Sequence, residues 1–230
     1  MRKAIEQYNM IHENELICVG VSGGKDSMLL LKGLRLYQYI CPFPYRLHAV
    51  CLDMGFKDSD FSQMQQYCDE LEIPLTVKQT GIAPIIFEDR KEKNPCALCA
   101  KMRRGALHDQ ALELGSHKVA LGHHADDFLE TFYLSMFYEG RIHSFSPVTH
   151  LSRKNITSIR PMIYAREKDI IYAVNRNNIP VVKSKCPADG LTKREEMKNL
   201  IKEIAEKIPG SDERSLHAVK KFLIPPPNHD

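Results

Sequence analysis

The chain has 230 residues, enough for one domain with a sizeable core. Apolar residues make up 43% and charged residues 27%, and no apolar run is long enough to span a bilayer, which excludes a disordered chain and a helical membrane protein. The net charge of +3 permits an anionic partner without requiring one. Because the first residues lack the apolar centre of a secretory signal, we expect a cytoplasmic location without membrane association.

Short runs rich in Val and Ile alternate with longer helical patterns along the chain. We expect strands at 15–21, 45–53, 74–79, 118–122 and 156–161. We expect helices at 27–39, 59–72, 97–114, 125–138 and 166–177, and a loop over 80–95. This alternation predicts an α/β fold, an open, doubly wound, mostly parallel five-stranded sheet with helices on both faces.

Two helical segments flank this alternating region. Residues 1–15 are expected to contain an N-terminal helix, and 190–230 a short, charged, helical C-terminal extension. The chain has no internal repeat and no low-complexity tract. We therefore expect one domain over 1–230, with the extension packed on the sheet domain.

The hexapeptide SGGKDS follows the first strand and opens the first long helix. Its members are Ser22, Gly23, Gly24, Lys25, Asp26 and Ser27. Ligands of an open parallel sheet bind beyond the carboxyl ends of the strands, and the two glycines and the helix N-terminus suit a phosphate there. The lysine adds a cation and the serines add hydroxyl donors. Asp26 would repel a bare phosphate, so we interpret it as a helix cap or as a ligand of phosphate-bound Mg²⁺.

The spacing of this hexapeptide excludes a Walker A loop, which needs four residues between its first glycine and Gly-Lys-Ser/Thr. A turn that merely caps the helix is the other interpretation. The hexapeptide resembles the SGGxDS signature of the PP-loop ATP pyrophosphatases. The resemblance implies that ATP binds here and is cleaved to AMP and diphosphate while a substrate oxygen is adenylated.

The segment LGHHADDFLETFYLSM at 121–136 resembles the second signature of that family, GHxxDDxxET. The resemblance implies that Gly122 lies at the nucleotide and that Asp126 and Asp127 hold Mg²⁺ or orient substrate. An acidic first turn that complements the helix dipole is the alternative. For His123 and His124, contacts to phosphate or substrate and roles in the core or in capping stay open.

Two further residues are expected near the nucleotide. Arg160, in the dipeptide Arg160–Pro161, matches a family arginine that lies near the nucleotide site, although it could also be an ordinary strand-end arginine. Asp53 ends the second strand, where this fold places the adenine, and we expect it to contact the ribose or the adenine.

Seven cysteines form an odd set in a chain without an export signal, so structural disulfides are not expected. Cys96 and Cys99 form a CxxC at the start of a helix, and Cys186 precedes Pro187. A CxxC alone fits redox, zinc or iron–sulfur chemistry, but the chain has no second CxxC to complete a zinc site. Three thiolates on a cubane leave one iron open to hold a sulfide.

Several segments together resemble the tRNA 2-thiocytidine synthetase family over roughly residues 3–180. They are KAIEQYNMI, SGGKDS, CALCAKMRRGAL, LGHHADDFLETFYLSMFYEG and IRPMIYAREKDI. The resemblance implies a [4Fe–4S] cluster on Cys96, Cys99 and Cys186, and thiolation of the cytidine at position 32 of the tRNA anticodon loop. The catalytic set it implies is Lys25, Asp26, Asp127, Cys99 and Cys186. Some members carry a second CxxC where this chain has KCPADGLTKRE, so Cys186 must serve there alone.

The partners implied are tRNA and a sulfur donor, either a cysteine desulfurase or free sulfide. Basic residues that could meet tRNA phosphates on one surface are Arg2, Lys3, Lys91, Lys93, Lys101, Arg103, Arg104 and Arg141. A solvated charged face is the alternative for each, and the sequence leaves both a monomer and a homodimer open.

Three rival functions fit parts of the same sequence. A persulfide on Cys99 or Cys186 could carry the sulfur in place of a cluster. The ATP loop could instead support another PP-loop tRNA modification, of the 2-thiouridine or lysidine type. A non-enzymatic nucleotide-binding iron–sulfur sensor is the third alternative.

Overall fold

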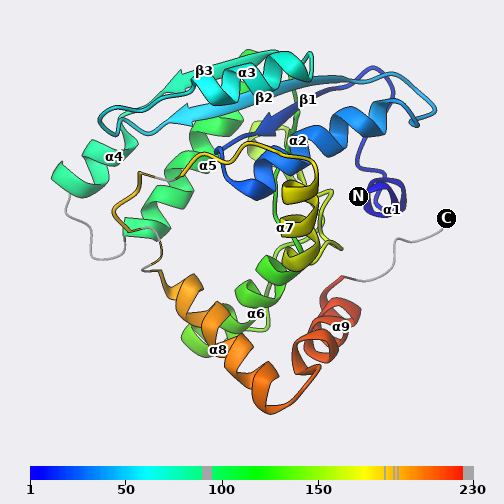
Figure 1. The fold of residues 1–230 in the computed structure, drawn as a ribbon, viewed down its shortest axis with the longest axis vertical. Helices are drawn as coiled ribbons and strands as arrows, with labels where there is room; N and C mark the ends of the chain where they lie inside the picture. The colour runs from blue at the N-terminus through cyan, green and yellow to red at the C-terminus, as the bar shows by residue number, and fades with distance from the viewer. Residues whose placement is uncertain (90–94, 184, 189, 191, 225–230) are drawn as a thin grey trace.

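The structure, a computed structural model, describes residues 1–89, 95–183, 185–188, 190 and 192–224. A six-stranded sheet runs in the order β3-β2-β1-β4-β6-β5, with helices on both faces (Figure 1). The strands are β1 (Leu16–Gly20), β2 (Arg46–Asp53), β3 (Leu75–Gln79), β4 (Lys118–Ala120), β5 (Val148–Leu151) and β6 (Ile156–Ile159). The longer helices are α2 (Lys25–Gln38), α3 (Ser62–Glu70), α5 (Pro95–Glu113), α6 (Ala125–Glu139), α7 (Glu167–Arg176), α8 (Lys193–Lys207) and α9 (Ser211–Leu223). The short ones are α1 (Arg2–Gln7), α4 (Ile82–Pro84), the π-helical η1 (Ile85–Asp89) and the 3₁₀ turn η2 (Ser152–Lys154).

The α/β class and the mostly parallel sheet are confirmed, but the predicted strand count of five is wrong. The sixth strand, β5, pairs antiparallel with β6 at the edge of the sheet. It has four residues, VTHL, and none of them is fully buried. A short edge strand with one wet face gives too little alternation to stand out in a sequence.

Residues 82–89 also differ from the sequence expectation, because they are helical where a loop was expected. Ile82, Ala83 and Ile86 are buried. Their spacing of one and then three residues places them on one face of a helix, so packing of that face stabilises the turn.

The strands bury both of their faces, as parallel strands covered by helices do. In β1, Ile17 and Val19 belong to the larger apolar cluster, which also contains the buried residues of α2 and α6. Cys18, between them, belongs to the second cluster with Leu107 of α5. This alternation fixes the register of β1 and places a different helix layer on each side of the sheet.

The chain reverses its direction of progress across the sheet between β1 and β4. From β1 it proceeds outward to β2 and β3, whereas β4 and β6 lie on the other side of β1. Such a switch point leaves a crevice at the carboxyl ends of the two central strands. The SGGKDS loop follows β1 and the GHHADD segment follows β4, so the topology brings both to this crevice.

The C-terminal helices α8 and α9 contact α6 and each other (Figure 1). The N-terminal helix α1 is shorter than the predicted range of 1–15, and it buries Ala4 and Ile5 in the larger cluster. Within the described residues, no helix is long and apolar enough to cross a membrane.

Candidate nucleotide and thiol site

A cavity of about 880 Å³ lies at the carboxyl ends of the central strands. The predicted site residues that line it are Ser22, Gly24, Lys25, Asp26, Ser27, Cys99, Gly122, Asp127, Arg160 and Cys186. Four other predicted residues, Gly23, Asp53, Cys96 and Asp126, are described by the structure but do not belong to this lining. The phosphate loop and two of the three candidate thiols therefore share one cavity.

The loop after β1 is braced by its own serines. Ser27 donates its hydroxyl hydrogen to the carbonyl of Gly24 at 2.9 Å, and its Oγ accepts from the amide of Ser22 at 3.1 Å. Gly23 has φ +83°, and a Cβ there would come within 2.9 Å of the Val182 Cβ. The Val182 amide also donates to the Gly23 carbonyl at 3.0 Å. The loop therefore requires glycine at 23 and is tied to the segment that carries Cys186.

Gly122 lets the end of β4 approach the start of α2. A Cβ at Gly122 would lie 3.1 Å from the carbonyl carbon of Asp26 and 3.1 Å from the amide nitrogen of Ser27. Both are backbone atoms, which cannot move aside as a flexible side chain can. The glycine therefore fixes how closely the two signature segments meet.

Lys25 lies in a chain of alternating charges that reaches α8. Its Nζ is 3.0 Å from Asp26 Oδ2 and 3.0 Å from Glu167 Oε1, and Lys198 of α8 contacts Glu167 at 2.8 Å. Burial lowers the pKa of Lys25, but the bonds to Glu167 and Asp26 outweigh it and raise the pKa. Burial likewise raises the pKa of Glu167, but the two lysines outweigh it and bring the pKa to about 2. Lys25 and Glu167 are therefore both charged near neutral pH.

His124 caps α6 in a reciprocal pair with Asp127. Its backbone amide donates to Asp127 Oδ2 at 3.0 Å, and its Nδ1 accepts from the Asp127 amide at 3.4 Å. Of the alternatives for His124, the structure thus supports capping. Its Nε2 also lies 3.7 Å from Asp26 Oδ1. That buried oxygen has no hydrogen-bond partner among the described residues.

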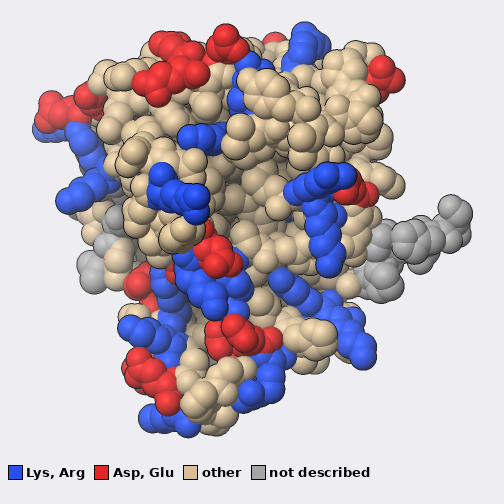
Figure 2. All heavy atoms as spheres, turned by 45° about the vertical axis from the view of Figure 1, so that its right-hand side comes forward, with Lys and Arg blue, Asp and Glu red and all other residues tan. Residues whose placement is uncertain are grey.

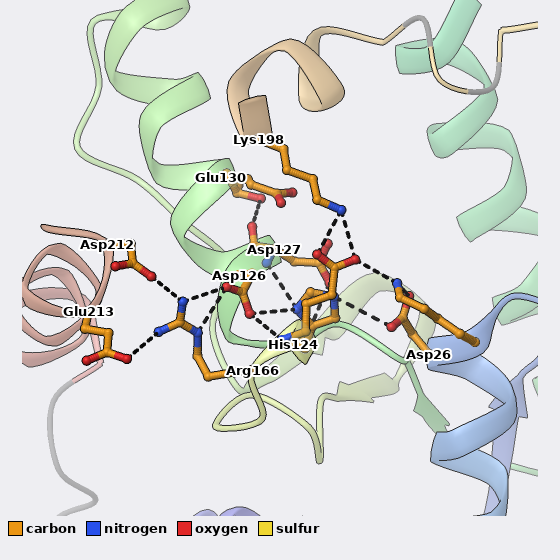
Figure 3. Close-up of polar contacts among 12 residues, drawn as sticks. Asp26, His124, Asp126, Asp127, Glu130, Arg166, Lys198, Asp212 and Glu213 are labelled. Carbon is orange, nitrogen blue, oxygen red and sulfur yellow. Dashed lines mark hydrogen bonds and ion pairs between the residues drawn. The ribbon is translucent and has the colours of Figure 1, made fainter. Parts of the chain in front are cut away.

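Asp126 is occupied by structural contacts. Its Oδ1 accepts from Arg166 Nε at 3.0 Å and its Oδ2 accepts from the amide of Glu167 at 2.7 Å, while Arg166 also pairs with Asp212 of α9 (Figure 3). These bonds argue against the predicted role of Asp126 as a magnesium ligand. The first carboxylate of the pair fastens α6 to α7 and α9, and the second, Asp127, lines the cavity.

Arg160 and His123 pack on the same aromatic ring, that of Phe145. The Arg160 Cζ lies 5.0 Å from the centre of this ring, and the His123 ring centre is also 5.0 Å away. Burial, and to a smaller extent Arg104, lowers the pKa of Arg160 to about 10. Burial is also the main cause that lowers the pKa of His123 to about 4, so the imidazole is neutral at pH 7.

Glu130, Arg194, Glu167 and Lys198 belong to this network, but sequence reasoning did not single them out. Arg194 of α8 donates to Glu130 Oε2 at 3.0 Å and to Thr131 Oγ1 at 3.0 Å. Burial and Asp127 raise the pKa of Glu130 to about 7, against the opposing effect of Arg194. Glu130 and Glu167 lie within quoted motifs, which was a signal. Arg194 lies within the quoted segment KCPADGLTKRE, whereas nothing local marked Lys198.

The three candidate thiols gather around Cys99. Burial raises the pKa of the Cys99 thiol, Arg103 opposes this, and the neighbouring thiols of Cys186 and Cys96 raise it further. Cys96 is exposed at the start of α5, whereas Cys99 is half-buried. Within the part of the chain that the structure describes, no three His, Cys, Asp or Glu side chains are arranged as a ready metal site.

Asp53 has a local role at the end of β2. Its Oδ1 accepts from the Gly55 amide at 2.9 Å, and its carbonyl accepts from the Thr80 hydroxyl at 2.7 Å. Asp53 thus shapes the turn that follows β2, and its contact with a ribose or an adenine stays a prediction.

The basic residues expected on one surface are divided. Arg103 and Arg104 line the cavity together with Lys183 and Lys185. Arg2 and Lys3 lie on α1, which Figure 1 shows well apart from α5. Lys91 and Lys93 lie outside the described residues. Figure 2 shows positive and negative side chains interspersed over the lower part of one face, which is not the pattern of a one-signed patch.

Comparisons with known proteins agree with this arrangement. A model of the PP-loop domain family matches residues 1–204. The tRNA-cytidine(32) 2-sulfurtransferase of Pelobacter propionicus is 39% identical over 210 residues, which are 90% of this chain and 78% of that protein. The tRNA-cytidine(32) 2-sulfurtransferase of Syntrophotalea carbinolica is 40% identical, with 90% of this chain and 81% of that protein covered.

Among solved structures, the U34-tRNA thiolase NcsA from Methanococcus maripaludis with its [4Fe–4S] cluster has a similar fold. Its TM-score is 0.77 at 20% identity, over 96% of this chain and 76% of that one. At this identity the likeness shows the fold alone. Given the extent of the family match and the identity to its relatives, the chain belongs to the PP-loop family that includes the tRNA-cytidine(32) 2-sulfurtransferases.

Proposed function

We propose that the protein is a tRNA sulfurtransferase that uses ATP to replace the C2 oxygen of a cytidine, at position 32 of the anticodon loop, with sulfur. The observation that carries this proposal is the cavity that Lys25 shares with Cys99 and Cys186. ATP activation and sulfur delivery can meet at one base only if their groups face a common space. The names and coverage of the relatives favour cytidine over other bases.

The phosphates of ATP would lie over the loop at 22–27. The loop places backbone amides and the N-terminus of α2 at the cavity, where a partial positive charge favours phosphate. Lys25 supplies a charged ammonium at the same point, held by Asp26 and Glu167. A triphosphate would compete with these two carboxylates, which pair with the half-buried ammonium before ATP binds.

The residues fit a magnesium ion bound together with the phosphates. Asp26 Oδ1 is buried without a hydrogen-bond partner in the described part of the chain, and Asp127 lines the same cavity. Mg²⁺ on nucleotides typically takes one or two carboxylates and completes its shell with phosphate and water. Asp26 and Asp127 would hold it, and the ion would offset the charge of the phosphates.

The thiols fit an iron–sulfur cluster by their chemistry and location. Cys99 is electrostatically coupled to both Cys96 and Cys186, and soft thiolates are the usual ligands of such clusters. Cys96, Cys99 and Cys186 would hold a [4Fe–4S] cluster. When bound, it would present sulfur at an iron that no protein residue ligates. Arg103, beside Cys99, would stabilise the added negative charge.

The cytidine would react within this cavity. Its C2 oxygen attacks the α-phosphorus of ATP and diphosphate leaves, so the oxygen becomes part of a good leaving group, AMP. Sulfide replaces that oxygen at C2 and AMP leaves; the sulfide comes from solution, or from the persulfide of a cysteine desulfurase after reduction by a thiol. Lys25 balances the charge on the phosphates, and Arg103 and Arg104 are placed to meet the RNA backbone. Burial of the adenylated base limits its hydrolysis.

We further propose that residues 1–230 act as one domain. Support comes from α8, because Lys198 reaches Lys25 through Glu167 and Arg194 reaches the second signature through Glu130. Removing the C-terminal helices would therefore disturb the nucleotide site as well as the surface.

The test uses the full chain, reconstituted anaerobically with iron and sulfide. It is incubated with unmodified tRNA, ATP and sulfide, and the nucleosides are analysed by mass spectrometry while diphosphate release is measured. We expect 2-thiocytidine at position 32 and one diphosphate for each sulfur inserted. Product from protein that lacks iron would remove the cluster from the proposal. Absence of both thiolated product and diphosphate with every tRNA would overturn the proposal.

A further inference from the structure

The wall of the cavity formed by the ends of β4 and β6 carries two polar groups that the chemistry above does not use. Arg160 is 9% exposed, and its Nε is buried with no hydrogen-bond partner in the described ranges. His123 Nδ1 is also buried without a partner there. Both residues line the cavity that holds Lys25 and Cys99. A buried donor left unpaired costs free energy, so such groups indicate a ligand that pairs with them.

The surroundings of Arg160 leave one edge of its guanidinium available. Nη1 donates to the carbonyl of Ser146 at 2.6 Å and to Thr149 Oγ1 at 3.1 Å. Nε and Nη2 form the opposite edge, and neither donates a hydrogen bond to a described residue. Phe145 supports the flat face of the group. The side chain is thus held in place while two parallel N–H donors remain for a ligand.

We propose that Arg160 and His123 form the subsite that selects cytosine, an inference that rests on the proposed function. Arg160 donates from Nε and Nη2 to the adjacent acceptors N3 and O2 of the base. The second lone pair of O2 stays available for attack on ATP. His123 Nδ1 accepts from the exocyclic amine at C4.

Uracil mismatches this subsite at two atoms. Its N3 carries a hydrogen that would face a donor of Arg160, and its C4 carries an oxygen that would face the acceptor Nδ1 of His123. Arginine has donors and no acceptor, so it cannot adapt to the hydrogen at N3. The neutral state of His123, which follows from its low pKa, allows one ring nitrogen to accept. A phosphate would also fit an arginine edge, but it offers nothing for a histidine acceptor to bind.

Binding of RNA stem-loops to the full chain tests the subsite. The loops are identical except for cytosine, uracil or 2-pyrimidinone at the position corresponding to 32; the last base keeps N3 and O2 but lacks the C4 amine. For the native chain we expect uracil to bind about 5- to 150-fold more weakly than cytosine. Arg160→Lys should strongly reduce this preference, since lysine cannot offer two parallel donors. His123→Ala should abolish the smaller preference for cytosine over 2-pyrimidinone.

Controls separate recognition from folding and from ATP binding. Arg153→Lys, on the exposed turn η2, makes the same substitution outside the cavity and should keep both preferences. ATP affinity should stay within about twofold in all variants if they fold and if Arg160 contacts the base. His123→Ala leaves the anchor of Arg160 on Ser146 and Thr149 intact, so it tests the subsite even if Arg160→Lys unfolds.

Three outcomes would overturn the inference. If Arg160→Lys lowers ATP affinity and keeps the preference for cytosine, the arginine holds a phosphate. If the native chain binds and thiolates cytosine and uracil loops equally, the subsite is absent although the proposed function stands. If the native chain neither binds nor modifies any RNA, the proposed function falls and this inference falls with it.

Discussion

The two halves of the cavity differ in how completely the protein prepares them. The nucleotide half is fixed by a positive-φ glycine, by serines bonded across the loop, and by the alternating charges of Lys25, Glu167 and Lys198. The thiol half has electrostatically coupled cysteines, but the described residues there are not arranged as a metal site. We infer that the fold itself holds the nucleotide half in place through these contacts. Variants on the two sides should therefore fail separately.

The largest effect is expected from Cys186→Ala. Loss of one of three thiol ligands should abolish thiolation and reduce bound iron from about four per chain to a trace. ATP affinity should not change, because the phosphate loop stays braced. Iron analysis, nucleoside mass spectrometry and calorimetric titration with ATP measure the three properties. Cys41→Ala, which removes a thiol outside the cavity lining, is the control. If Cys186→Ala lost ATP affinity together with its iron, the nucleotide half and the thiol half would depend on each other.

Lys25→Ala should give the converse result. We expect diphosphate release to fall about 100- to 1,000-fold, since a preorganised cation at the phosphates is lost. Iron content should remain that of the native chain. Lys32→Ala, a matched change further along α2, should keep full activity. Diphosphate release at the native rate by Lys25→Ala would contradict a role of Lys25 in the reaction of ATP.

Glu167→Gln tests the charged link between the loop and α8. The native ion pairs lower the pKa of Glu167 to about 2, which corresponds to up to roughly 3 kcal/mol of stability. Because the folded-state pKa is depressed, this stability is fully present above about pH 4.5 and is lost as the pH falls towards about 2. The difference in unfolding free energy between the native chain and the variant should shrink over that range. A difference independent of pH would mean that the carboxylate acts through packing.

The smallest effects concern backbone geometry. Gly23→Ala should destabilise the fold by about 1–3 kcal/mol, because φ +83° strains an L-residue and the added Cβ meets Val182. Gly105→Ala makes the same change inside α5, where the added Cβ meets no atom within 4 Å. It should stabilise by about 0.5–1 kcal/mol. Denaturant unfolding measures the change in the free energy of unfolding for each variant. Equal changes in Gly23→Ala and Gly105→Ala would contradict the requirement for glycine at position 23.

The sequence allowed the nucleotide half to be predicted because its signals are local. The loop at 22–27 and the segment at 121–136 each combine a strand end, glycine and charged groups within a few residues, and the parallel sheet brings their ends together. The strand β5 was missed because a four-residue edge strand with a wet face has almost no periodic signal. The π-helical turn at 85–89 was missed because the charged run at 88–95, which follows the buried residues Ile82, Ala83 and Ile86, indicated a loop.

The links from α8 could not be predicted from the sequence in the same way. Lys198 and Arg194 lie in a charged helical pattern, and only tertiary packing brings them to Glu167 and Glu130. The roles of Asp126 and Asp127 were predicted together from one motif. The structure separates them, because Arg166 and the Glu167 amide occupy Asp126, whereas Asp127 lines the cavity.

The most direct measurement is a crystal structure of the anaerobically reconstituted protein with a non-hydrolysable ATP analogue, with data collected at the iron absorption edge. We expect an anomalous iron peak bounded by the sulfurs of Cys96, Cys99 and Cys186, and phosphates over residues 22–27, both in the same cavity. An iron peak elsewhere, or phosphates bound away from that loop, would contradict this expectation.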